Sequence, residues 1–287
     1  MTSQIALPRR SAEANLSWIN IGFFGAFHAC ALLAPFCFSW AGVGIALSFH
    51  WLFGGVGICL GYHRLLSHRS FRVPKWLEYA IAVCGALAIQ GGPIFWVSSH
   101  RQHHSKTEDP VLDPYSAQKG FWWSHWMWLF RPDETFFNPQ HYQKKAQDLT
   151  RQSFYRLLDR YHLLLQVPLA VGLYLLGGWS YVVYGIFVRS VVLWHTTWLV
   201  NSATHRWGYQ TFHADDNARN LWWVALLTYG EGWHNNHHKY PSSAQTGFRW
   251  WEFDSTWLTI KVLGQIGLAK RIRREPIKSE KLEGPAN

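Results

Sequence analysis

Long segments almost free of charge limit what this chain can fold into. Four segments approach the roughly 20 residues that a helix needs to cross a bilayer. They cover residues 18–38, 41–62, 161–179 and 181–200, and Arg189 is their only Lys, Arg, Asp or Glu. Ser39 and Trp40 separate the first two, and Gly177 and Gly178 mark a turn between the last two. We therefore predict an all-α integral membrane protein with four transmembrane helices in two hairpins.

The composition agrees with a membrane protein. Nineteen tryptophans and a charged fraction of only 15% fit a chain whose aromatic rings lie at membrane interfaces. The formal charge of +10 does not form the basic stripe that nucleic-acid binding needs, so we expect no nucleic-acid partner. Nor do the first residues resemble a cleavable signal peptide, because the apolar run behind them is too long.

Basic residues predict the orientation. Residues 63–160 carry 13 Lys and Arg and residues 201–287 carry 11, whereas the two hairpin turns carry none. The positive-inside rule then places both termini and the long middle segment in the cytoplasm. We expect one membrane domain over residues 1–287, with a cytoplasmic cap at 63–160 and 201–270 and a basic tail at 271–287.

Residues 76–97 are a fifth apolar segment, with only Glu78 charged. A fifth span would separate the two basic regions, and Gln90-Gly91-Gly92-Pro93 should break a helix. We therefore predict an interfacial or buried helix that covers the cap. The cysteines lie in apolar stretches without a CxxC motif, so we read them as small buried hydrophobic residues: Cys30, Cys37, Cys59 and Cys84.

Eight of the 16 histidines fall in three clusters beyond apolar segments. Two clusters have the pattern H-x-x-H-H, whose rings share one face of a helix and can point at one place. The other has the spacing H-x4-H, about 140° apart on an α-helix, which suits a helix end that loosens into a loop. The clusters are His63 and His68; His100, His103 and His104; and His234, His237 and His238.

Neutral imidazoles are common ligands of iron, copper and zinc. Eight ligands exceed the needs of one ion, so two metals with four or five nitrogens each fit better. Zinc catalysis typically uses three protein ligands, and the H-E-x-x-H motif of zinc hydrolases is missing from the sequence. Nitrogen-rich sites with open positions suit iron. Glu231 begins a Glu-x-x-His motif, but carboxylates are otherwise scarce near the clusters.

Five segments resemble the membrane-bound fatty acid desaturases, and more narrowly the delta-9 branch that includes stearoyl-CoA desaturases and bacterial relatives. They occur in order between about Trp51 and Trp257. In sequence they read GYHRLLSHRSF, SHRQHHSKTEDP, GFWWSHWMWLF, TWLVNSATHRWG and GEGWHNNHHKYP. The resemblance implies a di-iron site held by nine histidines. It also makes a bacterial inner membrane the expected location.

The resemblance also assigns single residues. The ninth ligand would be His205, and Asn201 would reach a metal through water. Trp96, Thr197 and Gln90 would line the acyl tunnel. The remaining histidines are expected to be structural or surface residues: His28, His50, His125, His141, His162, His195 and His213.

The implied reaction is oxygen-dependent insertion of a cis double bond, at delta-9, into a saturated acyl chain. It would use two Fe²⁺ ions, dioxygen and a separate electron donor, either a ferredoxin or an NAD(P)H-linked reductase. Without a Gly-rich dinucleotide motif or a haem motif, the sequence offers no internal donor. Chain length and oligomeric state are left open.

The acyl carrier is open too. Animal enzymes of this branch have an Arg-Asp pair that helps grip coenzyme A, where this chain has Ser98 and Ser99, and a His where it has Tyr115. The expected carrier of the acyl group is thus either CoA or a lipid. The alternatives are a related di-iron acyl hydroxylase or acetylenase, possibly acting on acyl-carrier protein, and more remotely a membrane metal transporter, which would need ionisable residues within the spans.

Overall fold

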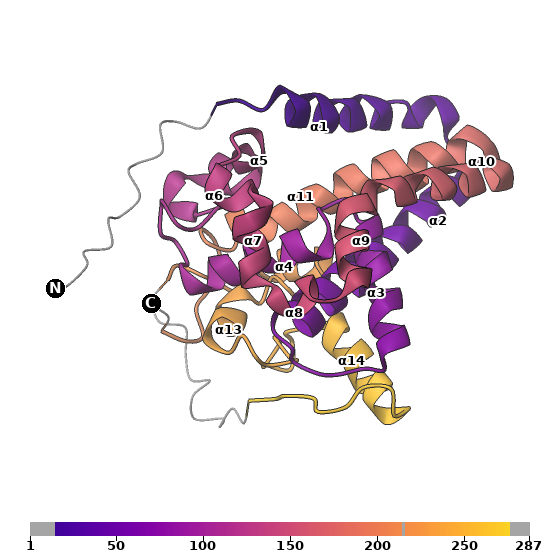
Figure 1. The fold of residues 1–287 in the computed structure, drawn as a ribbon. Helices are drawn as coiled ribbons and strands as arrows, with labels where there is room; N and C mark the ends of the chain where they lie inside the picture. The colour runs from indigo at the N-terminus through magenta and orange to yellow at the C-terminus, as the bar shows by residue number, and fades with distance from the viewer. Residues whose placement is uncertain (1–14, 214–215, 276–287) are drawn as a thin grey trace.

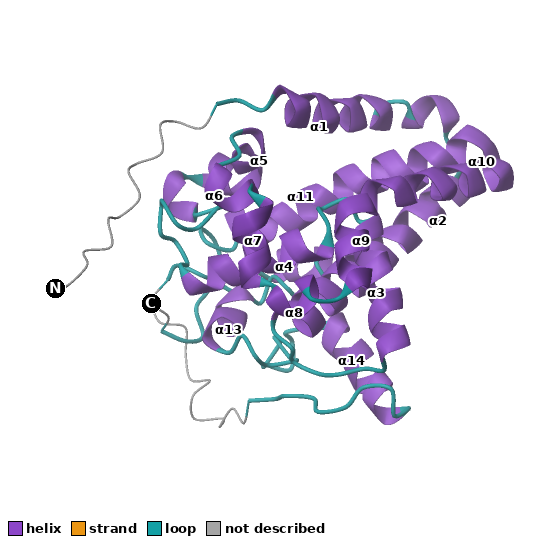
Figure 2. Cartoon of the chain, viewed as in Figure 1, coloured by secondary structure: helices purple, strands orange, loops and turns teal. Residues whose placement is uncertain are grey.

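Helices make up nearly all of the regular structure in the computed structural model, which describes residues 15–213 and 216–275 (Figures 1 and 2). Only isolated β-bridges accompany them in the described part. The first half contains α1 (Trp18–Ala31), η1 (Ala34–Cys37), α2 (Trp40–Phe49), η2 (His50–Ser67), α3 (Lys75–Leu87), α4 (Pro93–Ser105), η3 (Ala117–Lys119), η4 (Trp123–Met127), α5 (Trp128–Phe130), α6 (Glu134–Phe137) and α7 (Pro139–Lys145). The second half contains α8 (Gln147–Thr150), α9 (Ser153–Tyr161), η5 (His162–Leu165), α10 (Gln166–Val182), η6 (Val183–Val188), α11 (Arg189–Ser202), α12 (Trp222–Leu227), α13 (His234–Lys239) and α14 (Ser255–Gln265).

Two continuous helical stretches are long and apolar enough to cross a membrane: Trp40–Ser67, with 28 residues, and Ser153–Ser202, with 50. The longer one reverses at Gly177 and Gly178, where the backbone leaves the helical region and Gly178 has φ +62°. Helix α1 is apolar but has only 14 residues. It ends before the predicted residue 38 because Pro35 lacks an amide hydrogen and disfavours a helical residue before it. Four spans therefore remain a prediction.

The two predicted hairpin turns lie side by side. Ser39 caps α2, because its hydroxyl accepts a hydrogen bond of 2.9 Å from the amide of Gly42. The same hydroxyl lies 2.7 Å from the hydroxyl of Ser180. A serine N-cap satisfies an amide that the helix leaves free. In Figure 1 this end of the molecule lies at the right, where α2 and α10 meet. The contact supports the expectation that both turns lie on one side of the membrane.

Arg189, the one charged residue of the four apolar segments, is 1% exposed. Its guanidinium donates to the carbonyl oxygens of Gly185 and Leu87 and lies 4.8 Å from the ring of Phe53. A buried cation needs such partners. Arg189 thus ties α11 to η2 and to the end of α3.

The fifth apolar segment, residues 76–97, is divided between α3 and α4. The division falls where the sequence predicted a break: Gly91 has φ +94°, and Pro93 starts α4. Helix α3 packs along η2 in the main core, which also contains residues of α4, α9 and α14. All four cysteines are free, although only Cys59 is fully buried. The N-terminal residues 1–14 and most of the predicted basic tail lie outside the described residues.

Candidate metal centre

Nine histidines converge in two groups, each with its ring nitrogens within 4.8 Å of one another. The five-histidine group consists of His63, His68, His100, His104 and His237. The four-histidine group consists of His103, His205, His234 and His238. These are the eight cluster histidines together with His205, the ninth ligand that the resemblance implied.

Each H-x-x-H-H cluster contributes to both groups. On α4, His100 and His104 enter the five-histidine group while His103 enters the four-histidine group. On α13 the division is reversed, because His234 and His238 share a group and His237 joins the other. In both clusters the pair spaced i, i+4 stays together. The expectation that all three rings of a cluster point at one place was therefore wrong: one face of each helix serves two sites.

On an α-helix, residues spaced like His63 and His68 would point in different directions, but here their rings meet. The amide of His68 donates to the carbonyl of His63 at 3.1 Å, an i to i+5 bond. Such π-helical winding is common at functional sites, and here it brings residues five apart to the same side, with ring centroids 4.8 Å apart. The helix also continues to Ser67 rather than loosening at residue 62.

Pairs of imidazole Nε2 atoms face each other at short distances in both groups. Within the five-histidine group, Nε2 of His68 and His100 are 2.8 Å apart, and Nε2 of His104 and His237 are 2.9 Å apart. In the four-histidine group, Nε2 of His205 and His234 are 3.1 Å apart. Converging lone pairs of this kind fit a bound cation.

Carboxylates form hydrogen bonds with three of these histidines and a close contact with a fourth. The Nδ1 atoms of His103, His205 and His238 lie 2.9, 2.9 and 2.6 Å from Asp113, Glu108 and Asp216, and Nδ1 of His63 lies 2.9 Å from Glu231. A hydrogen on Nδ1 leaves Nε2 free to bind metal. The Nε2 atoms of His103 and His238 are buried without a hydrogen-bond partner. These residues therefore fit a pair of metal ions.

Burial keeps the imidazoles neutral, as metal ligands must be. It lowers the pKa of His100, His104, His234 and His237 well below the ordinary value and that of His238 to about 4. Burial alone would raise the pKa of Glu108 and Asp216. Hydrogen bonds from His205 to Glu108 and from His238 to Asp216 instead lower both pKa values to about 2, so the carboxylates are ionised.

Glu231 differs from the other three carboxylates because an arginine pairs with it. Arg64, 1% exposed, donates to Glu231 at 3.0 Å, to Asp254 at 3.0 Å and to the carbonyl of Ala244 at 2.8 Å. Buried charges of opposite sign held in such geometry stabilise each other's charged forms. Arg64 thereby fixes Glu231, which in turn orients His63.

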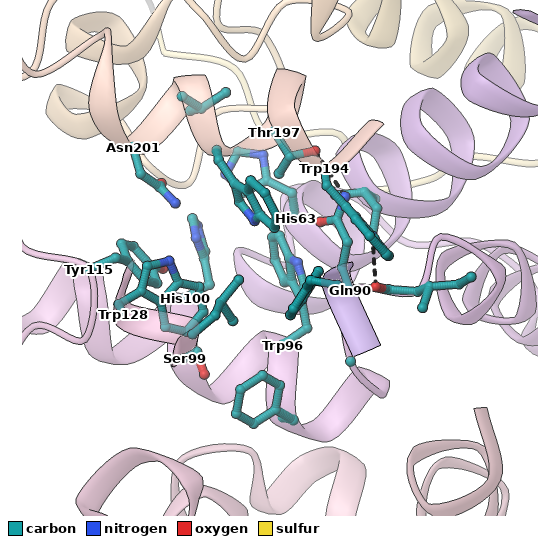
Figure 3. A pocket seen from close by; sticks show the side chains of 18 of the residues that line it. His63, Gln90, Trp96, Ser99, His100, Tyr115, Trp128, Trp194, Thr197 and Asn201 are labelled. Carbon is teal, nitrogen blue, oxygen red and sulfur yellow. Dashed lines mark hydrogen bonds between the residues drawn. The ribbon is translucent and has the colours of Figure 1, made fainter. Parts of the chain in front are cut away.

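An apolar cavity of about 360 Å³ is lined by residues of α1 and by histidines of both groups. Figure 3 shows His63 and His100 among its lining side chains. His63 and His100 of one group and His234 of the other line it. All three residues predicted for the acyl tunnel line it too: Gln90 donates to the hydroxyl of Thr197 at 2.9 Å, and Trp96 stacks on His100 with centroids 5.1 Å apart. Asn201 also lines the cavity, at the end of α11.

The histidines predicted to be structural lie outside both groups. His28, His195 and His125 form a row of contacts from α1 through α11 to η4, with Nε2 of His28 and His195 3.1 Å apart and Nδ1 of His195 3.0 Å from Nε2 of His125. The row ends at the carbonyl of Phe24 on one side and at the hydroxyl of Ser202 on the other. The others are polar contacts or exposed positions: His50 contacts Tyr229, His162 lines the cavity, and His141 and His213 are exposed.

The four carboxylates are the functional residues that sequence reasoning missed. Glu231 was noticed for its Glu-x-x-His spacing, but it contacts His63 rather than His234. Glu108 and Asp113 follow the second cluster closely, which is a usable local signal. Asp216 lies 22 residues before its partner His238, so no local pattern in the sequence connects the two.

Comparison with known proteins finds consistent relatives. The family model described as fatty acid desaturase matches residues 18–265. The sn-2 palmitoyl-lipid 9-desaturase of Nostoc sp. (strain 36) is 64% identical over 269 residues, which cover 94% of each chain. The sn-1 stearoyl-lipid 9-desaturase of Anabaena variabilis is 48% identical over 92% of this chain and 96% of its own. The enzyme of that same description from Synechocystis sp. (strain ATCC 27184 / PCC 6803 / Kazusa) is 50% identical over 94% of this chain and 85% of its own.

Proposed function

We propose that this chain inserts a cis double bond at carbon 9 of a saturated acyl chain esterified to a membrane glycerolipid. The chain belongs to the fatty acid desaturase family and is thus an oxidoreductase. The observation that carries this proposal is an apolar cavity that reaches both histidine groups. An apolar cavity with a few polar groups at one place suits an unbranched acyl chain.

The nine histidines would hold two iron ions, with Asn201 contributing through water. When bound, iron supplies the activation of dioxygen that removal of hydrogen from an unactivated methylene requires. The protein holds the imidazoles neutral, orients four of them through carboxylates, and excludes water with aromatic walls. Overall, the acyl chain loses two hydrogens while dioxygen, two electrons and two protons give two waters.

The cavity would also set which methylene faces the metals. Trp96 stacks on His100, and the Gln90–Thr197 hydrogen bond joins the segment before α4 to α11. These contacts fix the wall beside the histidines. We propose that Trp96, Thr197 and Gln90 form the bend that determines the double-bond position.

A lipid carrier is favoured over coenzyme A by the charge of the cavity. None of the residues that line it is Lys or Arg, and Ser98 and Ser99 are buried in the first turns of α4. The phosphates of coenzyme A would need cations near the acyl entrance. Instead, α1 contributes Ile19, Asn20, Phe23 and Phe24 to the cavity, so an acyl chain could enter from the bilayer. The named relatives act on lipid-bound palmitoyl and stearoyl chains.

The test is expression in a bacterial host that lacks unsaturated acyl chains, followed by mass spectrometry of intact lipids. We expect delta-9 monounsaturated chains on glycerolipids, and none in a His237→Ala variant. A hydroxylated or triple-bonded product would assign one of the alternative di-iron reactions. Unsaturation that appears first on CoA or on acyl-carrier protein would overturn the lipid carrier.

For location, we propose four spans in a bacterial inner membrane, with the termini and metal centre in the cytoplasm. The support is the absence of Lys and Arg from both hairpin turns together with the Ser39–Ser180 contact that joins them. A reporter that is active only in the periplasm, fused after Asn287, should be silent. An active fusion would contradict the topology.

A further inference from the structure

A second cavity, of about 720 Å³, lies away from the acyl cavity and is lined by charged side chains. Five of its residues are basic, namely Arg69, Arg72, Lys75, Arg271 and Arg273, and two, Glu78 and Asp148, are acidic. We call this cavity the basic groove. In Figure 1 its segments, the loop after η2 and the chain after α14, run along the lower edge, whereas α1 lies along the upper edge.

Two distant parts of the chain build the groove. Arg72 and Lys270 exchange both backbone hydrogen bonds at 2.8 Å, and the amide of Arg273 donates to the carbonyl of Ser70 at 2.8 Å. The end of the described chain is thus fixed against the loop that follows the first histidine cluster. This pairing presents basic side chains from both segments on one defined surface.

The charge of the groove is only partly balanced. Arg69 pairs with Asp148 and Lys75 with Glu78, each at 2.5 Å. Arg72, Arg271 and Arg273 are exposed and form no ion pair with a carboxylate of the described residues. An exposed basic surface of this kind attracts an acidic partner and raises its rate of association.

Residues that line or support the basic groove adjoin two members of the five-histidine group along the chain. Arg69 directly follows His68, which is only half-buried. On the other side, Asp148 accepts two hydrogen bonds from Arg101, at 2.7 and 3.0 Å, and Arg101 follows His100. Arg101 also donates to the carbonyl of Leu66 at 2.8 Å. Two metal-ligand candidates are thus one residue away from side chains that line or support the groove.

We propose that the basic groove docks an acidic one-electron carrier protein, which reduces the metal centre through the five-histidine group. This inference rests on the proposed function, because desaturation needs two electrons and this sequence has no motif for a reductant of its own. Two reduced carriers would each lose one electron per turnover, and two protons would come from water. A soluble protein fits better than a lipid headgroup because the groove lies at the end of the molecule remote from α1.

The experiment reverses two unpaired charges, in Arg72→Glu/Arg273→Glu. The control, Lys144→Glu/Lys261→Glu, reverses two exposed lysines outside the groove. Purified, iron-loaded enzymes in neutral lipid vesicles are assayed with two reductants: a reduced plant-type [2Fe–2S] ferredoxin as the acidic carrier, and reduced methyl viologen, a small cation that needs no acidic docking surface. Metal content and thermal denaturation establish that both variants fold.

We expect the groove variant to need at least tenfold more ferredoxin for half-maximal rate, with an unchanged viologen-driven rate, and the control to match the unsubstituted protein with both reductants. Added salt should weaken ferredoxin use by the unsubstituted protein and hardly affect the groove variant. Equal ferredoxin dependence in all three proteins would overturn the docking proposal, as would equal losses with both reductants. If the unsubstituted protein desaturates with neither reductant, it is the proposed function that fails.

Discussion

The two histidine groups share ligands from α4 and α13, yet their surroundings differ in charge. The five-histidine group has one carboxylate contact, through Glu231, and Arg64 offsets that charge. The four-histidine group has three carboxylates, and none of them pairs with a Lys or Arg of the described residues. They are Asp113, Glu108 and Asp216.

The difference suggests how each group compensates for what it lacks. Five neutral imidazoles can bind an ion because there are five of them. The group with four imidazoles relies in addition on carboxylates that orient the rings and raise their basicity. The surplus negative charge also favours the higher charge of an oxidised ion. The comparison therefore predicts that the two metals respond differently to loss of a ligand or of a carboxylate.

Removal of the metals should have the largest effect, because both groups depend on them. We expect chelation to abolish desaturation, about two equivalents of iron per chain to restore it, and zinc to occupy the site without activity, since zinc has no redox chemistry. Metal analysis alongside an oxygen-dependent product assay measures this. Activity restored by zinc and not by iron would refute the mechanism.

Loss of one ligand should affect the four-histidine group more. His205→Ala leaves three imidazoles in that group, so we expect nearly all desaturation and about one metal equivalent to be lost. His68→Ala leaves four imidazoles in its own group and should retain more of its metal. Both proteins should insert in the membrane normally, because the apolar helices are unchanged.

His213→Ala is the control for the ligand variants. His213 lies eight residues from His205 but is exposed and belongs to neither group. It should keep most of its activity and its full metal content. If His205→Ala matched it, the four-histidine group would have the wrong membership, and equal metal loss in His205→Ala and His68→Ala would remove the asymmetry.

The carboxylates should separate metal affinity from stability. Asp216→Asn should lower the affinity for one metal ion by about 10- to 100-fold, as for other groups that orient a ligand. It should hardly change the melting temperature of the metal-free protein. Glu231→Gln should instead lower the free energy of unfolding by about 1–3 kcal/mol, because Arg64 loses a buried charged partner. Metal titration and thermal denaturation give the two readouts, and identical behaviour would contradict the comparison.

The smallest effect concerns the cavity that joins the groups. In Thr197→Val the hydrogen bond from Gln90 is lost, which costs about 1 kcal/mol. We expect this to shift the ratio of delta-9 to other positional products by about fivefold while overall activity persists. Mass spectrometry of derivatised double bonds measures the ratio. An unchanged ratio would remove Thr197 from the residues that fix the acyl chain.

Much of this site was readable from the sequence because ligand clusters are local patterns. The spacing H-x-x-H-H gave six of the nine histidines, the spacing H-x4-H gave His63 and His68, and resemblance to a family added His205. The division of each cluster between two groups was not readable, since helical spacing says which residues share a face but not what lies opposite. The pairing of His63 with His68 depended on π-helical winding, for which we have no sequence rule.

The same limit applies to the fold. Uncharged runs located the apolar helices, and the glycines at 177 and 178 located a turn. The contact of Asp216 with His238 and the pairing of Arg72 with Lys270 depend on how the chain returns to the metal centre. Such contacts between distant segments leave no periodic pattern in one sequence.

Hydrogen positions are constrained along the row formed by His28, His195 and His125. Counting from the carbonyl of Phe24 to that of Trp198, the row makes five contacts. Both ends are acceptors, so each contact needs a hydrogen from within the row. Three neutral imidazoles and the hydroxyl of Ser202 supply only four. While all three rings are neutral, one contact is therefore empty, and its position fixes the tautomers of all three rings together. A change at His28 in α1 can thus alter the hydrogen bonding of Ser202, the neighbour of the cavity residue Asn201.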